Sequence, residues 1–303
     1  MMELLLFVAA ALRISVPYTL AAVGASFSER SGVINIGLEG TMLNGALAYT
    51  LGAWFTGDPW MGVASAVAAG LATAALHALV TIGFRADQIT AGLGINLLSA
   101  GLTKFVLTEV FHSSSNSPRV EGLPEWPAFG AAGIPALGPV LGTPLVLMTA
   151  GVVVAGGWLA FRSTFGLRLT AIGERPEAAA ALGLSVARHR TLGVLISGAL
   201  AGLAGAWLAS EQHSFTDSMT GGRGYIALAA MIVGRWSPAG AAAACLLFGA
   251  AEALQISLQG SGFPGELLQM LPYLVTMLAL VGLIGRATPP RAVGVPYDPE
   301  RLG

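Results

Sequence analysis

Residues 191–210 read TLGVLISGALAGLAGAWLAS and contain no charged side chain. A helix needs about 20 predominantly apolar residues to cross a bilayer, so this stretch has the length of one transmembrane helix. Gly198, Gly202 and Gly205 recur at spacings of four and three, which lets two transmembrane helices approach closely. We therefore predict a membrane-spanning helix here, whose small residues serve packing rather than chemistry.

The rest of the chain repeats this apolar pattern. Of its 303 residues, 54% are hydrophobic and 10% are charged, whereas soluble domains carry about 25% charged residues. Further apolar segments cover 4–27, 33–55, 60–84, 89–108, 143–162, 224–234, 238–257 and 266–285. The segment 224–234 is too short to span alone and predicts a partial crossing. We predict an all-α, polytopic transmembrane helical bundle of about 8–10 spanning or partial segments, forming a single domain over residues 1–303.

The arginines predict which loops face the cytoplasm. Loops on one side of the predicted bundle carry Arg30, Arg85, Arg162, Arg168, Arg175, Arg188, Arg190, Arg235, Arg286, Arg291 and Arg301. The other side carries Arg119 and Arg223. Cytoplasmic loops are enriched in basic residues, so loop 163–190 and the C-terminus are expected inside, and loop 109–142 and the N-terminus outside. The first segment follows Glu3 and not a basic region, which indicates a spanning helix rather than a signal peptide.

A weak internal echo is present. Residues 32–36, GVINI, resemble residues 224–228, GYIAL, and the pairs Asp58-Pro59 and Ser237-Pro238 each precede a helix of small residues. Repeated halves with interrupted helices are common in transporters. The alternative is chance similarity between two short stretches.

Residues 31–45, SGVINIGLEGTMLNG, place three polar side chains in a predicted membrane segment: Asn35, Glu39 and Asn44. Asn35 and Glu39 would share one face of a regular helix. A charged group at membrane depth costs at least about 2.5 kcal/mol and normally faces the bundle interior or water. The glycines of this stretch allow close packing or a break in the helix. The polar groups indicate either a cargo pathway or a hydrogen-bonded clamp between helices.

Outside this stretch, Asn96 and Glu252 are further pathway candidates, and Lys104 is expected to reach the membrane interface. Lys104 is the single lysine and has no P-loop glycines around it, so ATP hydrolysis by this chain is not expected. The histidines lack metal-ligand spacing, so we predict no metal site. No catalytic residue is assigned, Cys245 has no cysteine to pair with, and the net charge of −1 does not suggest nucleic-acid binding.

The loop 163–190 contains a helical signal at residues 173–184, GERPEAAAALGL. Pro176 suits a first helical turn, Glu177 complements the positive helix N-terminus, and Gly183 suits a left-handed stop. The stretch predicts a two-turn helix flanked by arginines. It is either a plain connector or an element that inserts into a groove on a partner.

Four stretches in this order resemble one family: 27–45, 173–183, 196–206 and 234–254. The chain resembles the permeases of ATP-binding-cassette (ABC) importers for branched-chain amino acids, ribose and nucleosides, over residues 15–285. The first stretch is most similar to the nucleoside and simple-sugar branch. Nucleosides are therefore the expected cargo, with simple sugars or amino acids as the alternative.

The resemblance implies a heteromeric complex in a bacterial plasma membrane. Two permeases, often non-identical, would sit on ATPase subunits that use ATP and Mg²⁺, and an extracytoplasmic substrate-binding lipoprotein would deliver cargo. This chain itself would bind no cofactor. The resemblance also makes the alanine-rich helix an ATPase contact, carried by Glu174, Arg175, Pro176, Glu177, Ala178, Ala179 and Gly183.

Two other classes compete with this interpretation. An ion-coupled carrier working alone could use Glu39 and Glu252 as proton sites. An intramembrane enzyme is disfavoured because the sequence lacks a serine–histidine pair, a di-aspartate and a metal cluster.

Overall fold

The computed structural model describes residues 2–124, 138–259, 264–282 and 288–298. Helices account for the regular structure in this part of the chain. Their bounds are α1 Met2–Arg30, α2 Leu38–Thr56, α3 Pro59–Ala78 with the π-helical turn η1 Leu79–Gly83, α4 Gln88–Phe111, α6 Gly138–Gly142, α7 Pro144–Arg162, α8 Thr164–Glu174, α9 Pro176–Ala181, α10 Val186–Gln212, α11 Arg223–Val233, α12 Pro238–Ser257 and α13 Gly265–Gly282. The predicted all-α class is confirmed.

Each predicted apolar segment corresponds to a helix. Six described helices are long and apolar enough to cross a membrane: α1, α3 with η1, α4, α7, α10 and α12. At 11 residues, α11 is too short to span alone, as the sequence indicated. The segment predicted from residue 33 becomes helical only at Leu38.

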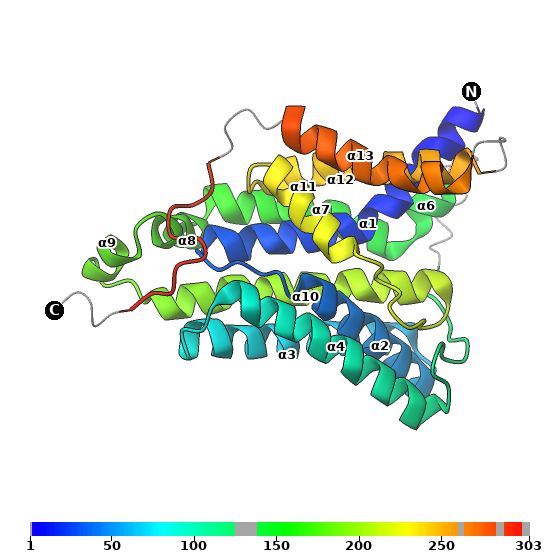
Figure 1. The fold of residues 1–303 in the computed structure, drawn as a ribbon, viewed down its shortest axis with the longest axis horizontal. Helices are drawn as coiled ribbons and strands as arrows, with labels where there is room; N and C mark the ends of the chain where they lie inside the picture. Colours follow the sequence, from blue (N-terminus) through cyan, green and yellow to red (C-terminus); the bar gives the residue numbers. More distant parts are fainter. Residues whose placement is uncertain (1, 125–137, 260–263, 283–287, 299–303) are drawn as a thin grey trace.

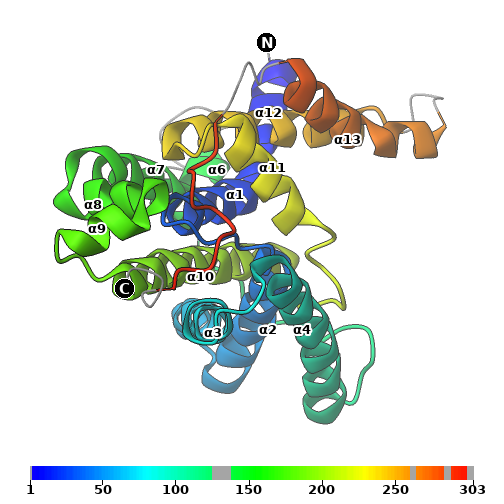
Figure 2. The same ribbon diagram turned by 60° about the vertical axis from the view of Figure 1, so that its left-hand side comes forward.

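Two long helices, α1 and α10, form the centre of the bundle. They pack against each other, α1 also packs against α12, and α10 packs against α2 and α3. In Figure 1, α2, α3 and α4 lie on one side of α10, and α11, α12 and α13 lie on the side of α1. The turned view of Figure 2 keeps this division and shows α7, α8 and α9 as a third group beside α1.

Glycines set the distance between α10 and its neighbours. A Cβ added at Gly205 would overlap the carbonyl oxygen of Met42 in α2, and one at Gly198 would overlap Ala74 in α3. On the α2 side, a Cβ at Gly45 would lie 2.5 Å from the carbonyl oxygen of Gly202. The predicted tight packing along this stretch is confirmed, and it holds α2, α3 and α10 together as one group.

The helices follow the same order in two halves of the chain. Long α1 precedes α2, α3 and α4, and long α10 precedes α11, α12 and α13. Asp58 and Ser237 cap α3 and α12 at equivalent places, each followed by proline. The short echo does not share this equivalence, because residues 32–36 are non-helical whereas residues 224–228 form the start of α11.

One end of the bundle carries α8 and α9, and the N-terminus lies at the other end (Figure 1). The C-terminal segment 288–298 runs along the α8–α9 end. There Ala292 N–H donates to Gly173 O at 2.8 Å, and Arg85 Nη1 donates to Asp298 Oδ1 at 2.8 Å. The turns that follow α1, η1 and α7 therefore gather at one end, together with their arginines.

At the opposite end, the chain after α4 pairs with the segment between α10 and α11. Ser117 N–H donates to Phe215 O at 2.9 Å, and Asp217 N–H donates to Ser115 O at 2.8 Å. The predicted irregular loop 109–142 thus contains the end of α4, this paired stretch and α6, while residues 125–137 lie outside the described residues.

Candidate functional site

The chain between α1 and α2 is not helical. Gly32 has φ +95°, which favours glycine, and α2 begins only at Leu38. The expectation that Asn35 and Glu39 share one helical face is therefore wrong, because Asn35 lies in the break and Glu39 in the first turn of α2. Asn35 is buried, and its Nδ2 donates to Ser197 Oγ at 3.1 Å, which ties the break to α10.

Glu39 holds the N-terminus of α11. Gly222 N–H donates to its Oε1 at 2.8 Å, and Gly224 N–H donates to its Oε2 at 2.7 Å. The cap residue Gly222 supplies no side-chain acceptor to these backbone groups. A carboxylate from another helix thus satisfies two free N–H groups and opposes the positive end of the helix dipole.

Asn96 in α4 connects three elements. Its Oδ1 accepts Gly40 N–H at 2.8 Å, while its Nδ2 donates to Ile36 O at 3.0 Å and to the Tyr225 hydroxyl at 2.9 Å. Every donor and acceptor of this amide except one lone pair is used. Asn96 therefore fixes α4 against the start of α2 and the start of α11.

Asn44 has a different environment. Its Nδ2 donates to Thr73 Oγ1 at 3.0 Å and to Ser99 Oγ at 2.9 Å, which joins α2 to α3 and α4. Its hydrogen bonds join helices, as in the hydrogen-bonded clamp that the sequence analysis gave as the alternative to a cargo pathway.

A cavity of about 360 Å³ lies between α2, α4 and the start of α11. Its polar lining comes from Glu39, Asn96, Ser218, Thr220 and Tyr225, and leucines of α2 and α4 supply apolar lining. A mainly apolar pocket with a few placed polar groups is typical of small-molecule sites. The structure brings Glu39 and Asn96 together here, while Asn35 and Asn44 do not line this cavity.

Glu252 lies in a separate polar cluster. The Tyr18 hydroxyl donates to its Oε2 at 2.5 Å, and Arg223 Nη2 donates to its Oε1 at 3.0 Å. A second cavity of about 220 Å³ adjoins these three side chains, with Gln255 among its lining. A cation at a helix N-terminus is unfavourable by about 0.3–1 kcal/mol, and Glu252 offsets this for Arg223 at the start of α11.

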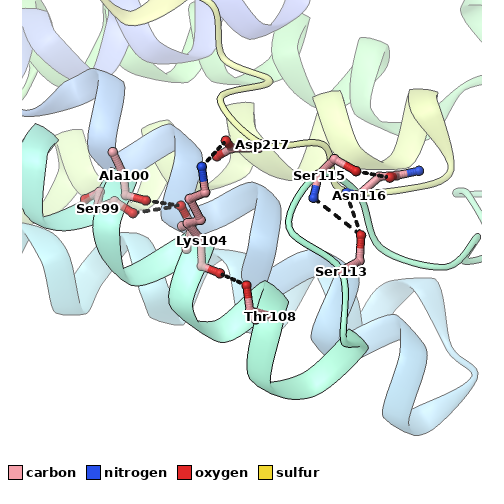
Figure 3. A network of polar contacts seen from close by, with 9 residues as sticks. Ser99, Ala100, Lys104, Thr108, Ser113, Ser115, Asn116 and Asp217 are labelled. Carbon is pink, nitrogen blue, oxygen red and sulfur yellow. Dashed lines mark hydrogen bonds and ion pairs between the residues drawn. The ribbon is translucent and has the colours of Figure 1, made fainter.

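An ion pair joins α4 to the segment before α11. Lys104 Nζ lies 3.6 Å from Asp217 Oδ2, and the side chains are 59% and 29% exposed. Figure 3 shows the pair beside the turn that holds Ser115 and Asn116. Lys104 thus has a partner within the chain, which the sequence did not predict. Exposed ion pairs contribute about 0.2–1 kcal/mol, so this contact is weak.

The two-turn helix predicted in the loop 163–190 is present as α9. It begins at Pro176, and Gly183 ends it with φ +81°. Pro176 and Ala179 are both buried, and Ala179, 3% exposed, packs in a cluster with Ile172 and Val186, so the expectation that these two side chains face a partner is wrong. The outward side of α9 and its C-terminal turn is formed by Glu177, Ala178, Ala181, Leu182 and Gly183, which follow the exposed Glu174 and Arg175.

The sequence matches a known family along most of its length. Residues 7–280 match the family described as "Branched-chain amino acid transport system / permease component". The chain belongs to this permease family. It is a transport subunit of the ABC type, and the ion-coupled carrier and the intramembrane enzyme are set aside.

Two relatives match this permease over most of its length. The guanosine ABC transporter permease protein NupQ of Bacillus subtilis (strain 168) is 39% identical, covering 96% of each chain. The nucleoside ABC transporter permease protein NupC of Lactococcus lactis subsp. cremoris (strain MG1363) is 36% identical, covering 93% of each. A solved structure, described as "An inward-facing conformation of a putative metal-chelate type ABC transporter", has the same fold, with TM-score 0.54 and 16% identity over 91% of this chain and 84% of that one.

Helix α8 contacts both α9 and the end of α1. Arg30, at the end of α1, donates from Nη2 to Thr170 Oγ1 at 2.8 Å and lies 4.5 Å from the centroid of the Phe161 ring. A Cβ added at Gly173 would overlap the carbonyl oxygen of Arg30. The end of α8 is therefore in close contact with the backbone of Arg30, which precedes the break before α2.

Sequence reasoning missed several lining residues of the permease. Tyr225, Ser218 and Thr220 line the cavity between α2, α4 and the start of α11, but they lie near or beyond the end of a short apolar segment and carry no pattern of their own. Tyr18 was missed because it lies within an unbroken apolar segment. Among the residues that the structure describes, no three His, Cys, Asp or Glu side chains gather as a metal site would require.

Proposed function

We propose that this protein is a permease subunit of an ATP-driven nucleoside importer in a bacterial plasma membrane. The observation that carries this proposal is the cavity of about 360 Å³, found in a chain 39% identical to a guanosine permease. An aromatic ring suits stacking on a nucleobase, and Tyr225 is 44% exposed beside the cavity. The alternative cargo is a simple sugar or an amino acid, which would not need this ring.

The proposal assigns the α8–α9 end to the cytoplasm. Among the described residues, arginines that the sequence places on one side, such as Arg30, Arg85 and Arg162, lie at this end, and basic residues favour the cytoplasmic side. The N-terminus is then outside and the C-terminus inside. The paired stretch around Ser117 and Phe215 faces outward, where a substrate-binding lipoprotein delivers cargo.

The outward face of α9 is proposed to contact the ATPase subunit. Small side chains at Ala178 and Ala181 allow close approach, and Leu182, 83% exposed, offers an apolar anchor. Because α8 contacts the backbone of Arg30, a displacement of α9 by the ATPase would be transmitted through α8 to the non-helical segment that precedes Glu39. This chain binds no cofactor in the proposal, and the partner ATPase uses ATP and Mg²⁺.

A second, non-identical permease is proposed to complete the pathway. Lys104 of α4 is a charged side chain that is 59% exposed on this chain, and such a group within a membrane helix normally faces water or protein rather than lipid. The exposed parts of α7 and α13 carry mainly apolar side chains, which suits contact with lipid.

Uptake by the reconstituted complex tests the proposed function. Both permeases, the ATPase and the binding protein are placed in vesicles, and radiolabelled guanosine, ribose and leucine are offered with and without ATP. We expect ATP-dependent uptake of guanosine alone. Uptake of ribose or leucine in its place would replace the cargo, and concentrative uptake without ATP would contradict the mechanism.

A further inference from the structure

Glu39 and Glu252, the two carboxylates that the sequence analysis named as pathway candidates, already have their partners. Both oxygens of Glu39 accept backbone N–H groups of α11, and both oxygens of Glu252 are taken by Tyr18 and Arg223. A cargo molecule that bound to either would have to break these hydrogen bonds. Their arrangement is that of structural groups rather than of cargo ligands.

The ion pair between Lys104 and Asp217 is longer and more exposed than these contacts. Their charged atoms are 3.6 Å apart, beyond ordinary hydrogen-bond length, and both side chains are partly exposed. An ammonium group has three donors and a carboxylate about four acceptor sites, so their contact with each other uses only a small part of this hydrogen-bonding capacity. Lys104 also lies about 10 Å inside the end of α4, by the 1.5 Å rise per residue.

The pair lies next to residues that line the cavity between α2, α4 and the start of α11. Asn96, Ala100 and Lys104 follow one another at four-residue spacing along α4, so they share one helical face. Asn96 and Ala100 line the cavity, and Lys104 is the next position outward. On the opposite wall, Ser218 lines the cavity directly after Asp217.

The chain that carries Asp217 is tightly folded. Ser218, Gly221 and Gly222 all have positive φ, and Glu39 holds the end of this stretch. Its outer part is paired with the stretch after α4, because Asp217 N–H donates to Ser115 O. The weak ion pair is therefore the contact that joins α4 to this wall above the cavity.

We propose that Lys104 and Asp217 form a cargo-binding site at the entrance of the cavity, and that this site takes the hydroxyl-rich sugar part of the cargo. Asp217 accepts hydrogen bonds from neighbouring hydroxyl groups, and Lys104 donates to a hydroxyl or ring oxygen. The ion pair opens as these bonds form, and the base then reaches Tyr225 and Asn96. This inference rests on the proposed nucleoside cargo for its ligand, although not for its geometry.

Thiol labelling tests the geometry without any cargo. Leu43→Cys, at a buried position that lines the cavity, is introduced in a Cys245→Ala background of the assembled complex, and a membrane-impermeant charged thiol reagent is added from outside. We expect Lys104→Met to speed labelling of the cavity cysteine roughly two- to fivefold, because an exposed ion pair stabilises closure only weakly. The charge swap of Lys104→Asp with Asp217→Lys should restore slow labelling.

Thr108→Cys is the matched control, since Thr108 lies one turn further outward on α4 and is exposed. Its labelling rate should not change with Lys104→Met. If the rate at Leu43→Cys is also unchanged, or if the swap labels as fast as Lys104→Met, the pair does not close the cavity and the inference is overturned.

Uptake tests the ligand. For the wild-type complex we expect a ribonucleoside to be taken up with a lower KM than its 2′,3′-dideoxy analogue, and Asp217→Asn to raise the ribonucleoside KM about tenfold while leaving the analogue unchanged. An equal effect on both solutes would contradict sugar recognition at this site. Failure of the wild type to import any nucleoside would refute the proposed cargo, while the labelling result would still decide the geometry.

Discussion

Glu39 in α2 accepts the backbone N–H of Gly224 in α11 at 2.7 Å. Helices from the two halves of the chain thus meet at their N-termini, with a carboxylate of one half capping the other. The contact leaves no room for a larger residue, because a Cβ at Gly224 would lie 2.6 Å from Glu39 N. The position of α11, and with it one wall of the cavity, depends on this junction.

Replacing Glu39 by glutamine should destabilise the permease. The amide has one acceptor oxygen for two N–H groups, and its NH₂ would face a donor, so a loss of about 1–3 kcal/mol is expected. Thermal unfolding and yield of the purified complex measure this. Glu109→Gln, at an exposed position near the end of α4, is the control. Unchanged stability with altered uptake would instead assign Glu39 to the cargo.

Gly205→Ala should disturb the packing of α10 on α2. The added methyl group meets the carbonyl oxygen of Met42, and overpacking of this kind costs about 1–3 kcal/mol. Gly101→Ala in α4 is a matched control, because a Cβ there meets open space. We expect Gly205→Ala to lower the unfolding temperature and Gly101→Ala to leave it unchanged. Equal unfolding temperatures would mean that the helices can separate without penalty.

The Arg223–Glu252 pair should behave as a coupled unit. Arg223→Met leaves a partly buried carboxylate with one partner, so it should cost about 1–3 kcal/mol. Adding Glu252→Gln to that variant should recover part of the loss. A double-mutant cycle on the unfolding temperature measures the coupling. Strictly additive effects would show that the two side chains do not stabilise each other.

The two neighbouring alanines of α9 should respond differently to tryptophan. At the exposed Ala178, the ring should block ATPase docking while the permease still folds, so uptake and ATPase co-purification are lost at normal yield. At Ala179, 3% exposed, the same ring cannot be accommodated in the buried cluster and yield itself should fall. If the Ala178→Trp variant retains the ATPase fully, α9 is a plain connector and does not contact the ATPase.

Sidedness can be measured with two single cysteines. Ser114 and Ala187 are exposed and lie at opposite ends of the bundle. An impermeant reagent added to intact cells should label Ser114→Cys, and Ala187→Cys should react only after the membrane is permeabilised. Labelling of both from one side would refute the arginine-based orientation.

Helix positions could be predicted because each helix carries its own pattern. Apolar runs of spanning length gave the segments, and Pro176 and Gly183 gave the ends of α9. The break before α2 could not be read in this way, since residues 33–36 are mostly apolar. There Gln88 Oε1 accepts the N–H of Ile34, and His77 Nε2 contacts its carbonyl oxygen, so distant side chains replace the helical hydrogen bonds.

The candidate site was only partly predictable for the same reason. Intramembrane polarity singled out Glu39 and Asn96, and both line a cavity, while their role in a cargo pathway stays a prediction. It could not separate them from Glu252, because α11 lies between the two cavities and that placement depends on tertiary packing. Nor could it orient Ala179, since four identical alanines give a helix no distinguishable face.

The glycine contacts between α10 and its neighbours constrain how this protein can diversify. Where a single methyl group meets a facing backbone, one substitution cannot be compensated by another nearby, because the obstacle is main chain and has no side chain to shrink. Lineages that acquire a different cargo should therefore inherit α2, α3 and α10 almost unaltered. Their adaptive changes should accumulate on α4, on the start of α11 and in the stretch that joins α10 to α11.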